Sequence, residues 1–362
     1  MDMEALLRPR FARVESRRRA YAFVMALLQR VPRKNNWQLA REAGELTPRG
    51  MQRLLIEASW DADLIRDDLR AYIVDQLNSP HGVLLIGETG FLKQGRQSVG
   101  VTRQYCGGAR RRDNQQVGIF LAYATVRGCA FIDRALYLPA EWASDRARRE
   151  AAGVPSTVRF ATKETLAQAM LERAFTAQVP ATWVIGNDLF EYEKLRYWLA
   201  VERRAYALRI VGDYNLGKAD DEVDAHTLAA RLPLEAWHRQ PTRVGNRGPR
   251  WYEWAYLSLP DKSAQGWKHW LLTRRNIIDV YERAYYCVHA PAETPLRAMV
   301  AAVEARGQME TAFTEARDGV GLADYEVRRW DGWHRHITLS LLAHAVVIVA
   351  HTRAIAAEAK NG

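Results

Sequence analysis

The stretch VLLIGETGF at residues 83–91 passes from a short apolar run into a polar segment that contains two glycines. A run of this length and composition is typical of a buried strand, and the change at Gly87 predicts that the strand ends there in a small turn. Functional side chains of α/β proteins often follow the carboxyl end of such a strand. Here glycine occupies that position, so the stretch predicts a sheet whose expected carboxylate is missing.

Strand and helix patterns continue outward from this stretch and indicate a mixed α/β fold. Short glycine-containing turns join the first strands, which favours an antiparallel meander, and helix and strand patterns then alternate. The expected strands lie at 83–87, 97–105, 117–125, 130–138, 181–187 and 205–211, and the expected helices at 142–152, 162–177 and 191–200.

The segments on either side divide the chain into four expected parts. Apolar residues three or four apart predict helices from about residue 15 to 77, whereas 213–265 is polar with scattered aromatics and predicts an irregular or β-rich insertion. Strands at 269–275 and 283–289 and helices at 295–317 and 336–360 follow. The expected parts are a helical segment (1–80), the first part of the core (81–212), the insertion (213–265) and the core completion with C-terminal helices (266–362).

The charge of the chain is strongly basic. Its 362 residues include 52 Lys and Arg against 42 Asp and Glu, a net charge of +10. Much of the excess lies in short runs, at 16–19, 110–112, 146–149 and 273–276. Such a surface is suited to polyanions, nucleic acid above all, and the alternative is a solvated basic face without a partner.

Cysteine use and hydropathy predict a soluble, cytoplasmic protein. The three cysteines have no CxxC spacing, so neither a disulfide framework nor a zinc site is indicated. The N-terminal residues lack an apolar signal core, and the longest apolar run, 337–350, is too short to span a bilayer and contains His344. No membrane association is expected.

Several long motifs resemble the DDE transposases of bacterial insertion sequences, in the same order and over nearly the whole chain, with 213–265 the weakest part. The motifs are RKNNWQLAREAG (33–44), WDADLIRDDLRAYIVDQL (60–77), ETGFLKQGRQSVGVTRQYCG (88–107), NQQVGIFLAYAT (114–125), LYLPAEW (136–142), AAGVP (151–155), FATKETLAQAML (160–171) and LADYEVRRWDGWHRHITLSLLAHA (322–345).

The resemblance implies an RNase H-like core, with a five-stranded mixed sheet between helices, a helical DNA-binding segment before it, and an insertion before the last acidic helix. It also implies a reaction in which three carboxylates hold two divalent cations. Mg²⁺ is a hard cation that prefers oxygen ligands, and the two ions together stabilise the attacking and leaving oxygens of a phosphodiester.

Two of the three carboxylates implied by the resemblance are absent. The first family Asp corresponds to Gly87 and the second to Asn187. The third, in a helix signature with Arg four residues before and a basic residue seven after, corresponds to Glu310, with Arg306 and Arg317. Glycine offers no ligand and Asn only a neutral carbonyl, so the two-magnesium site is predicted to be lost and no other cofactor is expected.

Neighbouring acids do not replace the missing ones in this interpretation. Glu88 and Asp188 each lie one residue along, and successive side chains of a strand point to opposite faces. The family pattern also has an acid at each of these positions, so both residues are interpreted as inherited.

Other motifs favour packing over chemistry. The imidazoles of WHRH (333–336) are two residues apart at the start of a helix, a spacing that separates the rings, so hydrogen bonding and packing are favoured over a metal pair. The tryptophans 267, 270, 330 and 333 are interpreted as packing residues, with base stacking as the alternative.

Three functions fit these observations. The first is a transposase-derived protein that has lost metal-dependent cleavage and strand transfer and binds double-stranded DNA as a regulator or architectural factor. The second is a fold repurposed for a small molecule in the former cleft, with Glu310 as general acid or base, Asn187 as a hydrogen-bonding amide, and Arg103 or Arg317 as an anion clamp. The third is an inactive partner of an active transposase. The sequence makes no prediction of oligomeric state.

Overall fold

The computed structural model describes residues 3–106, 111–186, 193–216, 223–242, 250–260 and 265–361. The chain forms two compact units, and each is described by itself. The first comprises Met1–Pro80, Gly87–Pro180 and Gln308–Gly362, and the second comprises His81–Ile86 and Ala181–Gly307. These units divide the chain differently from the four parts expected above, which stay a prediction.

The first unit begins with the helices expected between residues 15 and 77. Side-chain caps mark two of their starts: Asn35 accepts a hydrogen bond from the backbone of Gln38, and Asp61 from that of Asp63. The helices are α1 (Met3–Leu7), the short 3₁₀ helix η1 (Arg8–Arg10), α2 (Val14–Leu28), α3 (Asn36–Glu42), α4 (Arg49–Ile56) and α5 (Ala62–Leu77).

The strands of the first unit surround a long central strand, β3. Its first part pairs with β2 and its second part with β4, both antiparallel, while β1 lies on its other side. The expected meander is therefore wrong in order, because β3 is long enough to pair with two strands in succession along one edge. The strands are β1 (Gly82–Leu92), β2 (Thr102–Cys106), β3 (Arg111–Thr125) and β4 (Gly128–Tyr137).

The sequence predicted that strand β1 ends at Gly87, but the strand continues to Leu92. Glu88 and Thr89 are 3% and 2% exposed, and each has a polar partner, Lys163 for Glu88 and Arg317 for Thr89. Polar residues are tolerated inside a strand when such partners satisfy them. The predicted turn is wrong because partners so distant in sequence cannot be read from local composition.

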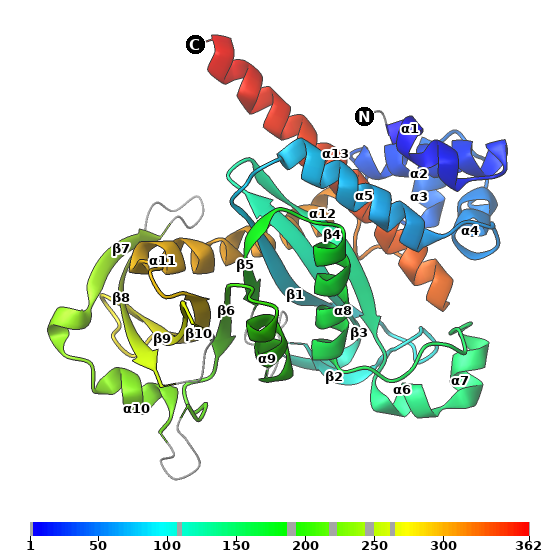
Figure 1. Ribbon diagram of the computed structural model, residues 1–362. Helices are drawn as coiled ribbons and strands as arrows, with labels where there is room; N and C mark the ends of the chain where they lie inside the picture. The colour runs from blue at the N-terminus through cyan, green and yellow to red at the C-terminus, as the bar shows by residue number, and fades with distance from the viewer. Residues whose placement is uncertain are drawn as a thin grey trace. The chain divides into compact units, whose positions relative to one another are not determined.

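Helices cover both faces of this sheet. Helix α8 (Lys163–Thr176) crosses in front of it in Figure 1, and α12 (Arg306–Val320) and α13 (Trp330–Asn361) pack on the opposite face. Short helices α6 (Ala140–Ser144) and α7 (Arg146–Ala151) precede α8. Helix α13 begins six residues before the expected start at His336.

Helix α13 is long and apolar enough to cross a membrane, judged by length and composition. The helix is longer than the apolar run 337–350, because it also includes the flanking residues. Half of its most apolar window is buried, and the helix contacts β4, α5 and α2. Figure 1 shows α5 alongside it. Such burial is typical of the core helix of a soluble protein.

The second unit is a sheet with parallel and antiparallel parts. Residues 82–86 of β1 pair in parallel with β5, and β5 pairs in parallel with β6, while the strands that follow pair antiparallel in the order β6, β10, β9, β8, β7. The strands are β5 (Ala181–Gly186), β6 (Tyr206–Ile210), β7 (His238–Thr242), β8 (Arg250–Leu259), β9 (Trp267–Asn276) and β10 (Arg283–Pro291).

The described part of the insertion is partly β-structured, as the sequence predicted. It contains α10 (Ala225–Ala230), the 3₁₀ helix η2 (Leu234–Ala236), β7 and β8. Helix α9 (Glu193–Val201) lies before it and α11 (Leu296–Glu304) after it. The single helix expected at 295–317 is two helices, since Ala305 separates α11 from α12.

One buried lysine joins distant helices of the first unit. Lys34 is 4% exposed, and its Nζ donates to the carbonyl oxygens of Leu27, of Gln29 at 2.6 Å and of Gly319 at 2.7 Å. These carbonyls lie at the C-terminal ends of α2 and α12, where backbone oxygens have no partner within the helix. A cation there also interacts favourably with both helix dipoles.

Acid sensitivity is expected from His336 at the start of α13. Burial lowers the pKa of His336 to about 4, from 6.5 in the unfolded chain, so the unfolded state binds the proton first as the pH falls. The contribution of His336 to the free energy of unfolding is fully present above pH 6.5 and is lost as the pH falls toward 4. At pH 4.5 the loss from this residue is about 2–3 kcal/mol. Urea unfolding at pH 7 and 4.5 measures it. His336→Gln should reduce the difference between the two pH values, and an unchanged difference would contradict the assignment.

Candidate functional site

Gly87 lies against helix α12 within the first unit. A Cβ added to Gly87 would lie 2.7 Å from Sδ of Met309, 3.0 Å from its Cε and 3.4 Å from Cε2 of Phe313. Met309 is only 2% exposed. The side of Gly87 to which a Cβ would point is therefore filled by a thioether, and no open space lies beside the position that the resemblance assigns to the first acid.

A row of side chains closes this face of β1. Met309, Phe313 and Arg317 recur every four residues, which places them on one side of α12. The ring of Phe313 packs on Phe131 of β4, with centroids 4.8 Å apart. One turn further on, Arg317 Nη2 donates a hydrogen bond to Oγ1 of Thr89. Helix α12 thus covers the strand from Gly87 to Thr89.

The three signature positions expected on a helix all lie on α12. Glu310 directly follows Met309 but is exposed, because adjacent residues of a helix point about 100° apart. Arg306 precedes it by one turn and is partly exposed. Arg317 is an exposed residue whose guanidinium bonds Thr89, and partial burial of that group lowers its pKa. The remaining acid of the signature is therefore at the surface, while the apolar residue beside it faces Gly87.

Glu88 points to the opposite face of β1, as its one-residue offset predicted. Its Oε2 lies 2.5 Å from Nζ of Lys163, at the start of α8. That ammonium also lies 5.6 Å from the centre of the Tyr137 ring. A buried carboxylate held by an ion pair on the far face does not replace the acid missing at Gly87.

Arg103, the other candidate anion clamp, lies elsewhere on the sheet. It is exposed on β2, opposite Asn114 of β3, and β3 separates that strand from β1. Arg317, by contrast, is bonded to Thr89 of β1.

Asn187 and Asp188 lie outside the described residues. The residues before the two positions that the resemblance assigns to acids are neighbours, since Ile86 pairs with Gly186 in the parallel register of β1 and β5. Within the described ranges, no group of three or more His, Cys, Asp and Glu side chains gathers at a place that could hold a metal ion.

The motif WHRH lies in the first two turns of α13, and both imidazoles make local hydrogen bonds. Nδ1 of His334 lies 2.9 Å from the Trp330 carbonyl, and Nε2 of His336 lies 3.1 Å from the Gly321 carbonyl. Trp333 is fully buried beside them. The interpretation of this motif as a hydrogen-bonding and packing element is confirmed.

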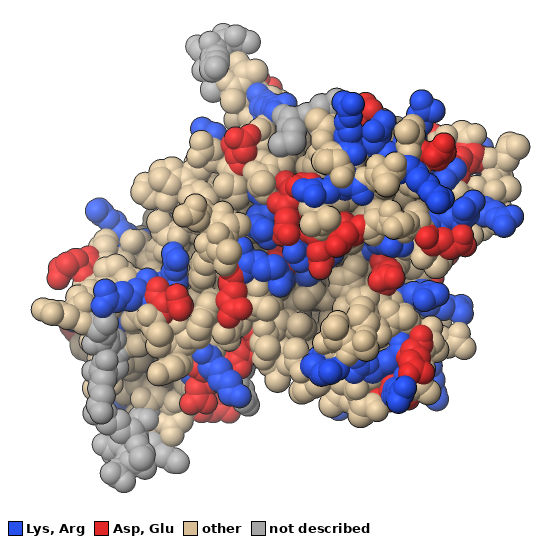
Figure 2. Space-filling model, turned by 45° about the vertical axis from the view of Figure 1, so that its right-hand side comes forward, with Lys and Arg blue, Asp and Glu red and all other residues tan. Residues whose placement is uncertain are grey.

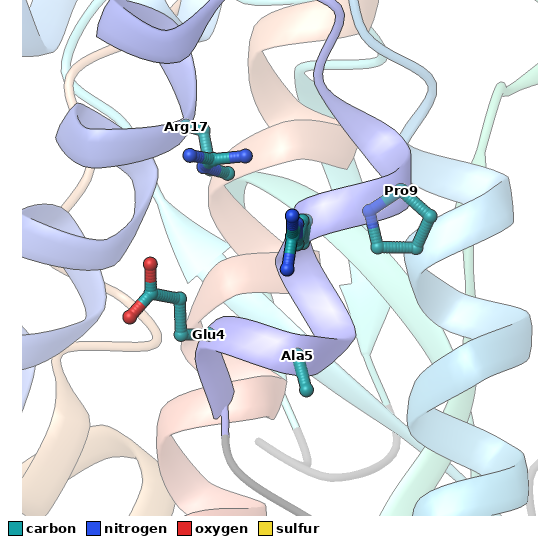
Figure 3. Close-up of a pocket in the computed structure, with 5 residues that line it drawn as sticks. Glu4, Ala5, Pro9 and Arg17 are labelled. Atoms are coloured by element: carbon teal, nitrogen blue, oxygen red, sulfur yellow. The ribbon is translucent and has the colours of Figure 1, made fainter.

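A cavity lies in the N-terminal helices, at residues far in sequence from the signature positions. It measures about 890 Å³ and is lined by Glu4, Ala5, Arg8, Pro9 and Arg17. Figure 3 shows Glu4 and Arg17 on its wall, from α1 and α2. None of the candidate site residues lines it.

The comparisons with known proteins identify the family. The DDE superfamily endonuclease family matches residues 6–246, about two thirds of the chain. No curated protein matches it. The chain belongs to the DDE superfamily endonucleases, and its mixed sheet with flanking helices is consistent with their RNase H-like fold.

Sequence reasoning missed the residues that fill the position beside Gly87. Apolar or small residues at 309, 312, 313, 316 and 320 could have shown that this face of the helix is buried. Nothing in the sequence indicated that Met309 reaches Gly87, because that contact depends on how α12 is placed on β1.

Proposed function

We propose that this chain binds double-stranded DNA without cutting it, as a member of the DDE family whose two-metal centre has been dismantled. The packing of Met309 against Gly87 carries the proposal. Two cations in such a centre need several charged oxygen ligands, and they must stabilise both the attacking and the leaving oxygen. A thioether buried at the first acid position supports the loss of that chemistry.

The retained DNA affinity is argued from charge. Contacts with phosphates are spread over many residues, so loss of two carboxylates leaves them in place, and the net charge is +10. Figure 2 shows Lys and Arg over much of the visible face, with acidic side chains between them. The N-terminal helical segment carries a set of exposed arginines: Arg8, Arg13, Arg18, Arg30, Arg41 and Arg49.

The basic runs are unequal candidates for DNA contacts. Within 146–149, Arg146 pairs with Glu150 at 2.8 Å, and Arg148 lies over the Trp142 ring at 4.0 Å. In the helical segment Arg19 pairs with Glu45 at 2.9 Å. Arg13, just before α2, and Arg18, on α2, are exposed. We therefore place the DNA-binding surface on the helical segment.

Duplex affinity should fall steeply with salt. Removal of one phosphate-binding side chain should reduce the slope of log K against log salt by about 0.9, because counterions are released on binding. Replacing Arg13 and Arg18 together by Gln should therefore weaken binding and reduce the slope by about 2, if each binds one phosphate. Anisotropy titrations of a labelled duplex at several salt concentrations measure both. Arg146→Gln is the matched control, and equal effects of the control and the double variant would contradict this surface.

The small-molecule alternative is not favoured by the geometry. It required space beside position 87 and an anion clamp that included Arg317. Met309 fills that space, and Arg317 is bonded to Thr89. A cytoplasmic location is part of the proposal, and it fits the three free, buried cysteines.

A further inference from the structure

A groove of about 480 Å³ opens in the second unit at the amino-terminal ends of the parallel strands. This is the edge opposite to the one where Ile86 and Gly186 end, so the groove is distinct from the positions of the family acids. Its walls come from the starts of β1 and β5, the turn between α9 and β6, the adjoining ends of β9 and β10, and the start of α11.

The charge of the groove suits an anion. His81, Arg203 and Arg204 line it, and no Asp or Glu is among its described lining residues. The start of α11 adds Thr294 and Pro295, which places the positive end of a helix dipole at the same wall.

Two tryptophans, Trp183 and Trp267, supply a planar apolar wall. The indole of Trp267 stacks on His289, with ring centroids 4.8 Å apart and planes 22° apart. His289 is 2% exposed and also hydrogen bonds the backbone of Arg204. One buried ring therefore contacts both the Trp267 indole and the backbone of Arg204.

Arg203 has a backbone conformation that normally selects glycine. Its φ is +50°, and its N–H donates to the Ala200 carbonyl at 3.1 Å, so it terminates α9 in the left-handed region. A residue with a Cβ is strained there, and such strain is concentrated at functional sites. Arg203 therefore stands at the end of α9 with its backbone in a conformation that glycine adopts more readily.

We propose that this groove binds a nucleotide, with the phosphate held by Arg203 and Arg204 and the base stacked on tryptophan. Arg recognises phosphate by paired N–H donors, and stacking on tryptophan accepts any base. The volume lies in the range of small-molecule sites. This inference does not rest on the proposed duplex binding, since it concerns another surface and a ligand without a double helix.

Calorimetric titration of the full chain with dAMP tests the site. We expect saturable binding with Kd on the order of tens of micromolar, and much weaker binding of deoxyadenosine or inorganic phosphate alone. Trp267→Ala and Arg204→Ala should each weaken dAMP binding by about 10-fold. Arg203→Gly should weaken it as well while leaving the Tm equal or raised, because glycine relieves the strained φ.

Matched controls are Trp251→Ala and Arg231→Ala, which change exposed residues of the same unit outside the groove. The proposal is overturned if dAMP binding is not saturable, or if the groove variants bind dAMP as tightly as the control variants do. It is also overturned if inorganic phosphate alone binds as tightly as dAMP. If a single-stranded hexanucleotide binds at least 10-fold tighter than dAMP, the natural ligand of the groove is a nucleic-acid strand. If the two bind with equal affinity, the natural ligand is a free nucleotide. Trp267→Ala should leave duplex affinity unchanged, which separates this inference from the DNA-binding proposal.

Discussion

Replacing Gly87 by Asp, the acid of the family pattern, is expected to lower the free energy of unfolding by about 3–5 kcal/mol. The Cβ would approach Sδ of Met309 to 2.7 Å, and the carboxylate would enter a place that is closed to water. Burial of the charge is the main cost there, because the atoms that the new Cβ meets most closely belong to the end of the flexible Met309 side chain. Urea unfolding at pH 7 measures the loss.

The matched control for this substitution is Gly95→Asp. An added Cβ at Gly95 meets no heavy atom within 4 Å, and the residue is exposed. Its expected effect is within about 0.5 kcal/mol. The double variant Gly87→Asp, Met309→Ala should be less destabilised than the two single changes predict together, because removal of the thioether makes room for the carboxylate. Equal stability of the Gly87 and Gly95 variants would show that Met309 does not fill this position.

Lys34→Met is expected to lower the free energy of unfolding by about 3 kcal/mol or more. Methionine keeps the apolar stem but removes the hydrogen bonds to the carbonyls of Leu27, Gln29 and Gly319. Carbonyls at the ends of two helices would then lack a partner where little water reaches them. The cost exceeds that of one ordinary hydrogen bond, since Lys34 serves all three oxygens.

Chemical denaturation of Lys34→Met beside Lys194→Met checks this prediction. Lys194 is exposed on α9, so its replacement should change stability by less than about 0.5 kcal/mol. Similar unfolding midpoints for the two variants would mean that the bonds made by Lys34 contribute nothing net to the fold.

Local patterns were enough to predict much of the secondary structure. The helices between residues 15 and 77 were found from apolar spacing, and the caps Asn35 and Asp61 are of the residue types that start helices. Strands β5, β9 and β10 were found from their apolar and aromatic runs. These signals are contained within a few residues of each other.

The extent of β1 could not be predicted in the same way. Glu88 finds its partner Lys163 75 residues away, and Thr89 finds Arg317 228 residues away. The pairing of β1 with β3 is likewise a long-range choice, set by the length of β3. Polar residues that are satisfied by tertiary contacts look like a turn until those contacts are known.

The packing around the candidate site could not be predicted from the sequence. Resemblance to the family assigns Gly87 to the first acid position and Glu310 to an acidic helix; Glu310 lies on α12, which packs against Gly87, and the assignment itself stays a prediction. The small-molecule interpretation placed a ligand in the former cleft, yet Met309 fills the place beside Gly87. The contact depends on the side chain of Met309 facing strand β1, and no pattern of residues in the sequence predicts that orientation.

The decisive experiment is incubation of a labelled duplex with the natural chain in Mg²⁺, at concentrations where anisotropy shows the DNA to be bound. We expect the bound duplex to remain uncut, because Gly87 supplies no carboxylate at the first acid position and Met309 fills the place beside it. Mg²⁺-dependent cleavage of the bound duplex that disappears in Glu310→Ala would contradict the loss of the two-metal centre.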